Sequence, residues 1–176
     1  MKVFFLFLLV GLGYHQPVWE KESINWRTRR QLTWTDFRGT PVETAPNAAM
    51  TSTSILINFN YDKSGLRYNL SCVFYPGKSW TKVSSRHILG HEQGHFDISE
   101  LYTRKLHKAL QAYKFRENTA DADIKAIYGQ VAKEQAAFQS LYDQQTNYSR
   151  NTPEQASWQE KIRAELDGLN AYAQYP

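Results

Sequence analysis

The chain has 176 residues, of which 41% are hydrophobic and 14% aromatic, and this composition excludes an intrinsically disordered protein. The length predicts one domain with a sizeable core and is short for two. The formal net charge is only +4, and the densest basic cluster, Arg27, Arg29 and Arg30, does not extend into a stripe, so we expect no nucleic-acid partner.

The N-terminal residues have the layout of a secretory signal peptide. Lys2 precedes the apolar run 3–10, and small residues follow up to Gly13. We expect cleavage after Gly13, which makes 1–13 a signal peptide and 14–176 a single mature domain. The run is shorter than the roughly 20 apolar residues that span a bilayer, so we expect a secreted or periplasmic protein with no stable membrane span after signal removal. An uncleaved anchor or a buried N-terminal strand is the alternative.

The first part of the mature chain, 14–83, is expected to be β-rich. Segments 54–61 and 66–74 alternate apolar and polar residues, and the turn-forming residues between them predict a hairpin. Residues 31–34 are expected to add a further strand. Cys72, the single cysteine, falls in the second segment, and we interpret it as a buried structural thiol rather than a nucleophile.

The second part, 84–176, has an apolar period typical of helices. The expected helices run from a cap at Ser84 or Ser85 to about Tyr113, from about Thr119, and from a cap at Thr152. The predicted fold class is therefore α+β, with a small N-terminal antiparallel sheet packed against a C-terminal three-helix unit.

A short motif in the first predicted helix carries the chemistry: His91-Glu92-Gln93-Gly94-His95, an H-E-x-x-H sequence. Four residues make just over one helical turn, so both imidazoles project from one face and can converge on one Zn²⁺ ion. Glu92 then lies beside the metal, where it can act as the general base toward a metal-activated water. The motif predicts a zincin-like active-site helix, and Gly94 offers no side chain where a substrate or strand approaches. Two solvent-facing or capping histidines without a metal are the alternative.

A catalytic zinc site takes at least three protein ligands, so a third must come from elsewhere. The short link between the first two helices implies an antiparallel hairpin, and counting around it places Tyr142 opposite His91. The candidates at the end of the second helix are Tyr142, Asp143 and Tyr148. A carboxylate is the ordinary oxygen ligand, and a phenol can bind when the metal lowers its pKa.

Further polar residues near the motif have expected supporting roles. His87 lies about 12 Å from His95 along the helix axis, which excludes it from the same ion. Asp97 or Glu100 can orient the imidazoles, because ligating histidines usually donate their other ring N–H to a carboxylate or carbonyl; a solvated helix face is the alternative. Tyr142 can donate to a developing oxyanion, with a core position as the alternative.

These residues resemble a family of bacterial exported proteins that are predicted zinc-dependent proteases and catalogued as a domain of unknown function. The resemblance covers most of the mature chain and rests on residues 91–100, 79–80 and 32–39, Tyr142-Asp143, Thr146, Gln155 and Trp158. Relatives place a histidine two residues after the threonine, where this chain has Tyr148. The resemblance implies a secreted zinc peptidase. In this chain Tyr148 occupies the position at which relatives have a histidine, the candidate third ligand of the family.

We therefore predict a secreted zinc metallopeptidase that acts on a peptide or protein substrate. His91 and His95 bind Zn²⁺, with Tyr148 as the first candidate for the third ligand and Asp143 as the alternative. Glu92 deprotonates the metal-activated water that attacks the peptide bond. The alternative is a catalytically impaired or non-catalytic exported binding domain that keeps the fold, because Tyr148 replaces the expected histidine.

Overall fold

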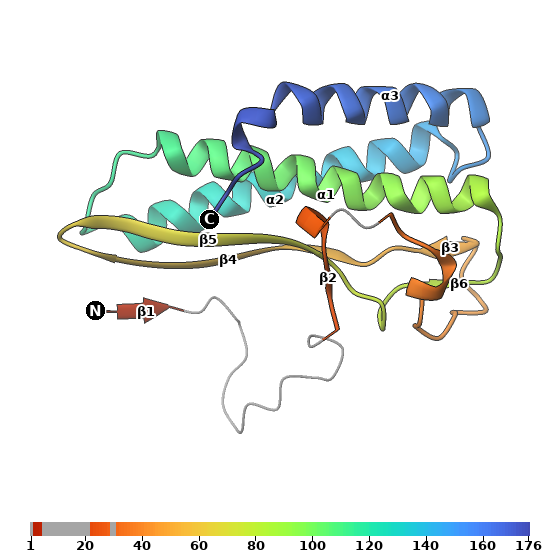
Figure 1. The fold of residues 1–176 in the computed structure, drawn as a ribbon, viewed down its shortest axis with the longest axis horizontal. Coiled ribbons are helices and arrows are strands. Elements are labelled where there is room, and N and C mark those ends of the chain that lie inside the picture. The colour runs from red at the N-terminus through yellow and green to blue at the C-terminus, as the bar shows by residue number, and fades with distance from the viewer. Residues whose placement is uncertain (1, 5–21, 29–30) are drawn as a thin grey trace.

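The computed structural model describes residues 2–4, 22–28 and 31–176. Figure 1 shows three helices on one side of a small antiparallel sheet, which confirms the α+β fold class. The helices are α1 (Arg86–Ala112), α2 (Ala120–Gln145) and α3 (Thr152–Gly168). The strands are β1 (Lys2–Phe4), β2 (Ile24–Asn25), β3 (Ala49–Met50), β4 (Thr53–Asp62), β5 (Gly65–Phe74) and β6 (Trp80–Thr81). Short 3-10 helices are η2 (Trp26–Thr28), η3 (Trp34–Asp36) and η4 (Asn170–Tyr172).

The predicted hairpin is confirmed as β4 and β5, which pair antiparallel from Thr53 opposite Phe74 to Asp62 opposite Gly65. A tight turn joins them, and Gly65 has a φ of 124°, a conformation that residues with side chains rarely adopt. The strand order of this sheet is β1-β4-β5-β2, while β3 and β6 form a second, two-stranded sheet. Cys72 is fully buried in β5, and burial raises the pKa of its thiol well above the ordinary value, as expected of a structural cysteine.

The predicted strand at residues 31–34 is wrong, because side chains take up the backbone donors of this segment. The Leu32 N–H donates to Gln93 Oε1 at 2.9 Å, and the Thr33 N–H donates to Asp36 Oδ2 at 2.7 Å. The chain then turns into η3 instead of joining a sheet, since local side-chain acceptors compete with a strand ladder.

The N-terminus contributes one short strand to the described structure. β1 pairs antiparallel with the edge of β4, where Lys2 lies opposite Tyr61. The other residues of the predicted signal peptide, with the predicted cleavage site after Gly13, lie outside the described residues, so the signal peptide stays a prediction. Within 2–4, 22–28 and 31–176, no helix combines the length and the apolar character that a bilayer crossing requires.

The predicted helices are confirmed to within a few residues. α1 follows Ser85 as its N-cap, and α2 follows Thr119. α3 begins at Thr152, but its cap is Asn151, one residue before the predicted cap, because the Asn151 side chain accepts the Glu154 N–H at 3.4 Å. The link between α1 and α2 is short, and the two helices form the expected antiparallel hairpin.

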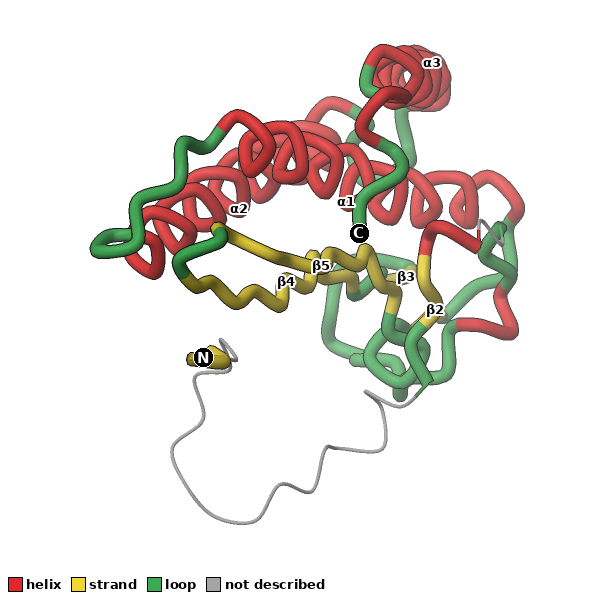
Figure 2. The backbone as a smooth tube through the Cα atoms, turned by 60° about the vertical axis from the view of Figure 1, so that its left-hand side comes forward, coloured by secondary structure: helices red, strands yellow, loops and turns green. Residues whose placement is uncertain are grey.

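Aromatic side chains pack the helices against the sheet and against one another. The ring of Phe96 on α1 packs against Phe74 of β5 at 5.8 Å between centroids. On the other side, Trp158 of α3 packs against Phe138 and Tyr142 of α2 at 5.0 and 5.4 Å. Figure 2 shows α3 on the side of α1 and α2 that faces away from the sheet. α1 is therefore held between the sheet and the other helices.

Candidate metal centre

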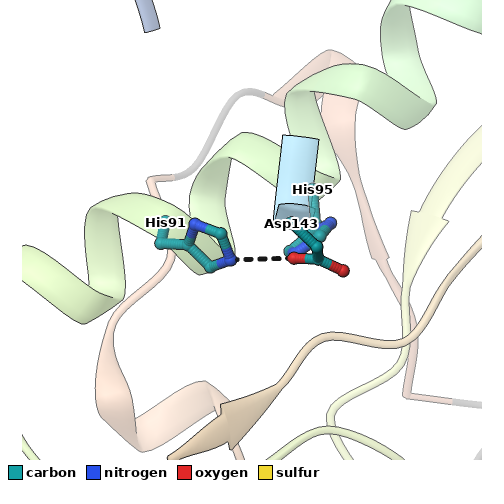
Figure 3. Close-up of side chains that lie close together, drawn as sticks. All are labelled: His91, His95 and Asp143. Atoms are coloured by element: carbon teal, nitrogen blue, oxygen red, sulfur yellow. Dashed lines mark hydrogen bonds and ion pairs between the residues drawn. The ribbon is translucent and has the colours of Figure 1, made fainter. Parts of the chain in front are cut away.

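α1 presents His91 and His95 on one face, as their spacing predicts. Their ring centroids lie 4.9 Å apart with perpendicular planes, and their side chains are 5% and 15% exposed. Each ring directs its Nε2 atom toward Oδ1 of Asp143, which comes from the last turns of α2 (Figure 3).

Asp143 completes a group of three ligating side chains. Its Oδ1 lies 3.1 Å from His91 Nε2 and 3.0 Å from His95 Nε2, and the three ligating atoms lie within 4.8 Å of one another. Ligands that surround a tetrahedral zinc ion at roughly 2.0–2.1 Å are about 3.3 Å apart. The two separations that involve Asp143 are close to this value, and the two histidine atoms lie within 4.8 Å of each other. The group His91, His95 and Asp143 could therefore hold a metal ion, and we call it the candidate metal centre.

Gly94 allows α2 to approach the motif this closely. A Cβ atom at Gly94 would overlap the Tyr142 hydroxyl and lie 2.8 Å from its Cζ atom. The Tyr142 ring stacks on His91 with centroids 4.5 Å apart, which confirms the predicted pairing of these residues. Its hydroxyl donates to the His91 carbonyl oxygen at 3.2 Å. The residue that approaches Gly94 is thus a buried tyrosine, and the core interpretation of Tyr142 fits this contact better than an oxyanion donor does.

Gln139, one turn before Asp143, fixes the orientation of His95. Its Nε2 donates to the His95 carbonyl oxygen at 3.0 Å, which directs its Oε1 to the ring Nδ1. Because an amide oxygen only accepts, Nδ1 carries a proton. Nε2 donates to Asp143, so it is the proton on Nε2 that must leave before this atom can bind a metal. We did not predict Gln139, although its position four residues before Asp143 places both on one helix face.

Asp97 and Glu100, the expected orienting carboxylates, join α1 to other parts of the chain. Asp97 Oδ1 accepts from the indole of Trp26 at 2.7 Å. Glu100 is fully buried, and its two oxygens accept from Arg104 at 2.9 Å and from Tyr175 at 2.8 Å. Burial raises the pKa of Glu100 above its ordinary value despite these two hydrogen bonds. The contacts give Glu100 a structural role on the side of α1 that binds the C-terminal segment.

Charges within the candidate metal centre stabilise one another. Burial lowers the pKa of His95, but the hydrogen bond and charge of Asp143 and the charge of Glu92 outweigh it, so this pKa is raised. Burial raises the pKa of Asp143, but hydrogen bonds from both histidines hold it well below the usual range. His91 Nδ1 is buried and has no hydrogen-bond partner among the described residues, so stacking and its Nε2 contact hold this ring.

Glu92 lies beside the candidate metal centre with 4% of its surface exposed. Its Oε2 accepts from Thr51 Oγ1 at 2.6 Å, and Thr51 belongs to the connection between β3 and β4. This bond positions the carboxylate and leaves Oε1 as its second acceptor. Thr51 was not predicted, because the contact joins residues 41 apart and no local pattern indicates it.

Tyr148, the other candidate ligand, lines one cleft together with His91, His95 and Asp143. Asn147, Tyr148 and Ser149 form a turn with φ of 48°, 51° and 73°, which is unfavourable for residues with side chains. The Tyr148 N–H donates to the Asp143 carbonyl at 2.8 Å, and His87 Nε2 donates to the Ser149 carbonyl at 2.5 Å. The Tyr148 residue is 55% exposed and lines the cleft. Asp143 belongs to the compact His-His-Asp group, and Tyr148 stays a candidate ligand that lines the same cleft.

The fold and the site together define an α+β protein with a largely buried His-His-Asp group that is compatible with metal binding. The chain belongs to a family described as a bacterial protein of unknown function, DUF922, whose family model matches residues 15–150. The match contains α1, α2 and the candidate metal centre, and it confirms the resemblance to a bacterial domain of unknown function. Comparison with curated proteins and with solved structures found no match.

Proposed function

We propose that the protein is an exported zinc-dependent peptidase. The observation that carries this proposal is the presence, in one cleft of about 490 Å³, of the His-His-Asp group and the Glu92 carboxylate. Two imidazole nitrogens and one carboxylate oxygen form a donor set that zinc takes in catalytic sites, where a fourth position stays open to water or substrate. Export rests on the signal-like pattern of residues 1–13.

Different residues would bind the metal ion and transfer the proton. His91, His95 and Asp143 would hold zinc, and Gln139, as the acceptor at Nδ1, would favour the His95 tautomer that can bind the ion through Nε2. A bound zinc ion lowers the pKa of water and polarises a carbonyl oxygen. These effects make hydrolysis accessible near neutral pH.

Glu92 acts as the general base and then as the acid. It accepts one proton from the attacking water through Oε1, while the water oxygen bonds to the carbonyl carbon of the substrate. Glu92 then gives that proton to the amide nitrogen as the carbon–nitrogen bond breaks, which releases an amine and a carboxylic acid. Thr51 holds the carboxylate in place through Oε2 during both transfers.

A Glu92→Gln substitution separates catalysis from metal binding. The variant is expected to bind one zinc per chain and to lose about 10²-fold or more of the cleavage of an unfolded protein such as casein, because an amide accepts no proton. The matched control is Glu134→Gln, which changes an exposed residue of α2 and should leave cleavage unaltered. Unchanged cleavage by Glu92→Gln contradicts the assigned role. A wild-type protein that binds zinc but cleaves nothing would instead support the non-catalytic binding domain.

A further inference from the structure

The cleft extends well beyond the candidate metal centre, and its walls come from two elements. One wall is the segment 47–53, which includes β3. Thr51 contacts Glu92, and Thr53 contacts Ser99 at 2.6 Å, so this wall follows α1 toward its C-terminal half. The opposite wall is a stripe of α2 with helical spacing, made of Ala132, Gln135, Ala136 and Gln139.

Charge in the cleft is confined to the metal centre and its base. Among the described residues that line the cleft, the acidic ones are Glu92 and Asp143, and none is lysine or arginine. The walls are therefore uncharged in a chain of which 22% is charged. A charged substrate side chain between these walls would lose water without gaining a partner, which is unfavourable.

Gln135 gives the α2 wall an uncharged hydrogen-bonding group. Its Nε2 donates to Ser99 Oγ at 3.0 Å, and this hydroxyl also bonds Thr53. The hydrogen bonds hold the amide and leave its Oε1 as an acceptor at the cleft. Ala132 and Ala136 line the cleft beside Gln135, and each contributes only a methyl side chain. The wall thus suits small or uncharged polar side chains and backbone N–H groups.

We propose that the cleft selects polypeptide segments whose side chains next to the scissile bond are uncharged, and that the α2 wall around Ala136 is the selecting subsite. This inference rests on the proposed peptidase function and names its class of substrate. In chain order the α2 stripe precedes Asp143 and Tyr148 follows it, so the ligand that α2 supplies lies between the stripe and Tyr148. A peptide bound along the cleft therefore has its flanking residues against this wall.

The test compares cut sites in one denatured protein substrate, mapped by mass spectrometry, for the zinc-loaded wild type and three variants. Ala136→Asp and Ala136→Lys place opposite charges on the α2 wall at an exposed helical position. Ala137→Asp is the matched control, because it adds the same charge to the next exposed residue of α2, which does not line the cleft.

The wild type is expected to cut between uncharged residues. Ala136→Asp should raise cleavage beside lysine and arginine by about fivefold, Ala136→Lys should do the same beside aspartate and glutamate, and Ala137→Asp should keep the wild-type preference. Wild-type cut sites enriched in charged residues, or identical preferences in all four proteins, would overturn this inference alone. Absence of cleavage by the wild type would overturn the proposed function and this inference with it.

Discussion

Single side chains decide whether His91 and His95 can share an ion. The proposed third ligating atom is Asp143 Oδ1, which lies 3.1 and 3.0 Å from the two Nε2 atoms, and Gln139 accepts from His95 Nδ1. Both come from α2, so the H-E-x-x-H sequence of α1 is insufficient without its partner helix. If Asp143 is the third ligand, as proposed, the metal does not require Tyr148.

Substitution of the two candidate third ligands tests this assignment. Asp143→Ala should weaken zinc binding by about 10²-fold, because it removes one of three protein ligands. Tyr148→Phe should leave zinc affinity unchanged, since the proposed centre takes its third ligand from Asp143. Affinities would be measured by competition with a chelating dye, with Asp167→Ala on the exposed face of α3 as the control for lost negative charge. The reverse pattern would make Tyr148 the ligand and remove Asp143.

Zinc affinity should depend on pH through His95. The pKa of this imidazole is raised in the metal-free protein, so the protonated form, which cannot bind zinc, persists to higher pH than for an ordinary histidine. Zinc affinity should therefore fall as pH drops from 8 to 6, by up to about tenfold per unit of pH below that pKa. Calorimetry in buffers of different ionisation heat should show more protons released per zinc at pH 6.5 than at pH 8. A proton release that is equal at both values would contradict this linkage.

The helix pair depends on the absence of a side chain at one position of α1. Gly94→Ala should destabilise the protein by about 1–3 kcal/mol, because the new methyl group collides with the buried Tyr142 ring. This loss opposes the roughly 1 kcal/mol that alanine gains over glycine inside a helix. Gly129→Ala in α2 is the matched control: nothing lies within 4 Å of its added Cβ, so the same change should stabilise. Urea unfolding measures both, and equal effects of the two substitutions would count against the close contact.

Elements with a regular spacing of apolar residues could be predicted from the sequence, and elements that depend on contacts distant in the sequence could not. The β4–β5 hairpin and the three helices follow from alternation and helical spacing in the sequence. Residues 31–34 also have the composition of a strand, but Gln93 of α1 accepts the Leu32 N–H and turns the segment away. A donor or acceptor 61 residues away leaves no local signal.

The same distinction explains the candidate site. His91, Glu92 and His95 lie on one turn, so their spacing alone indicated a metal. Asp143 was predicted as an alternative ligand, because counting around the helix link brought it near but did not rank it above Tyr148. Thr51 could not be predicted, since it contacts Glu92 from the connection between β3 and β4, 41 residues away in the sequence.

The whole molecule should gain stability from zinc, because the candidate metal centre exists only in the folded chain. It joins α1 to α2 through residues 52 positions apart, and the unfolded chain has no such site. Zinc at 100 times its Kd should add about 2.7 kcal/mol, which raises the melting temperature by about 5–10 °C for a chain of this size. Differential scanning calorimetry with and without zinc measures this shift. An equal shift in His95→Ala would show that zinc stabilises the protein elsewhere.

The most direct test of the central claim is the X-ray absorption spectrum of the zinc-loaded protein. A centre made of His91, His95 and Asp143 predicts one zinc per chain with two imidazole nitrogens at roughly 2.0–2.1 Å and oxygen ligands in the remaining positions. The spectrum of Asp143→Ala should change or lose its zinc signal, while that of Tyr148→Phe should match the wild type. A wild-type protein that retains no zinc, or a spectrum with fewer than two imidazoles, would contradict the account.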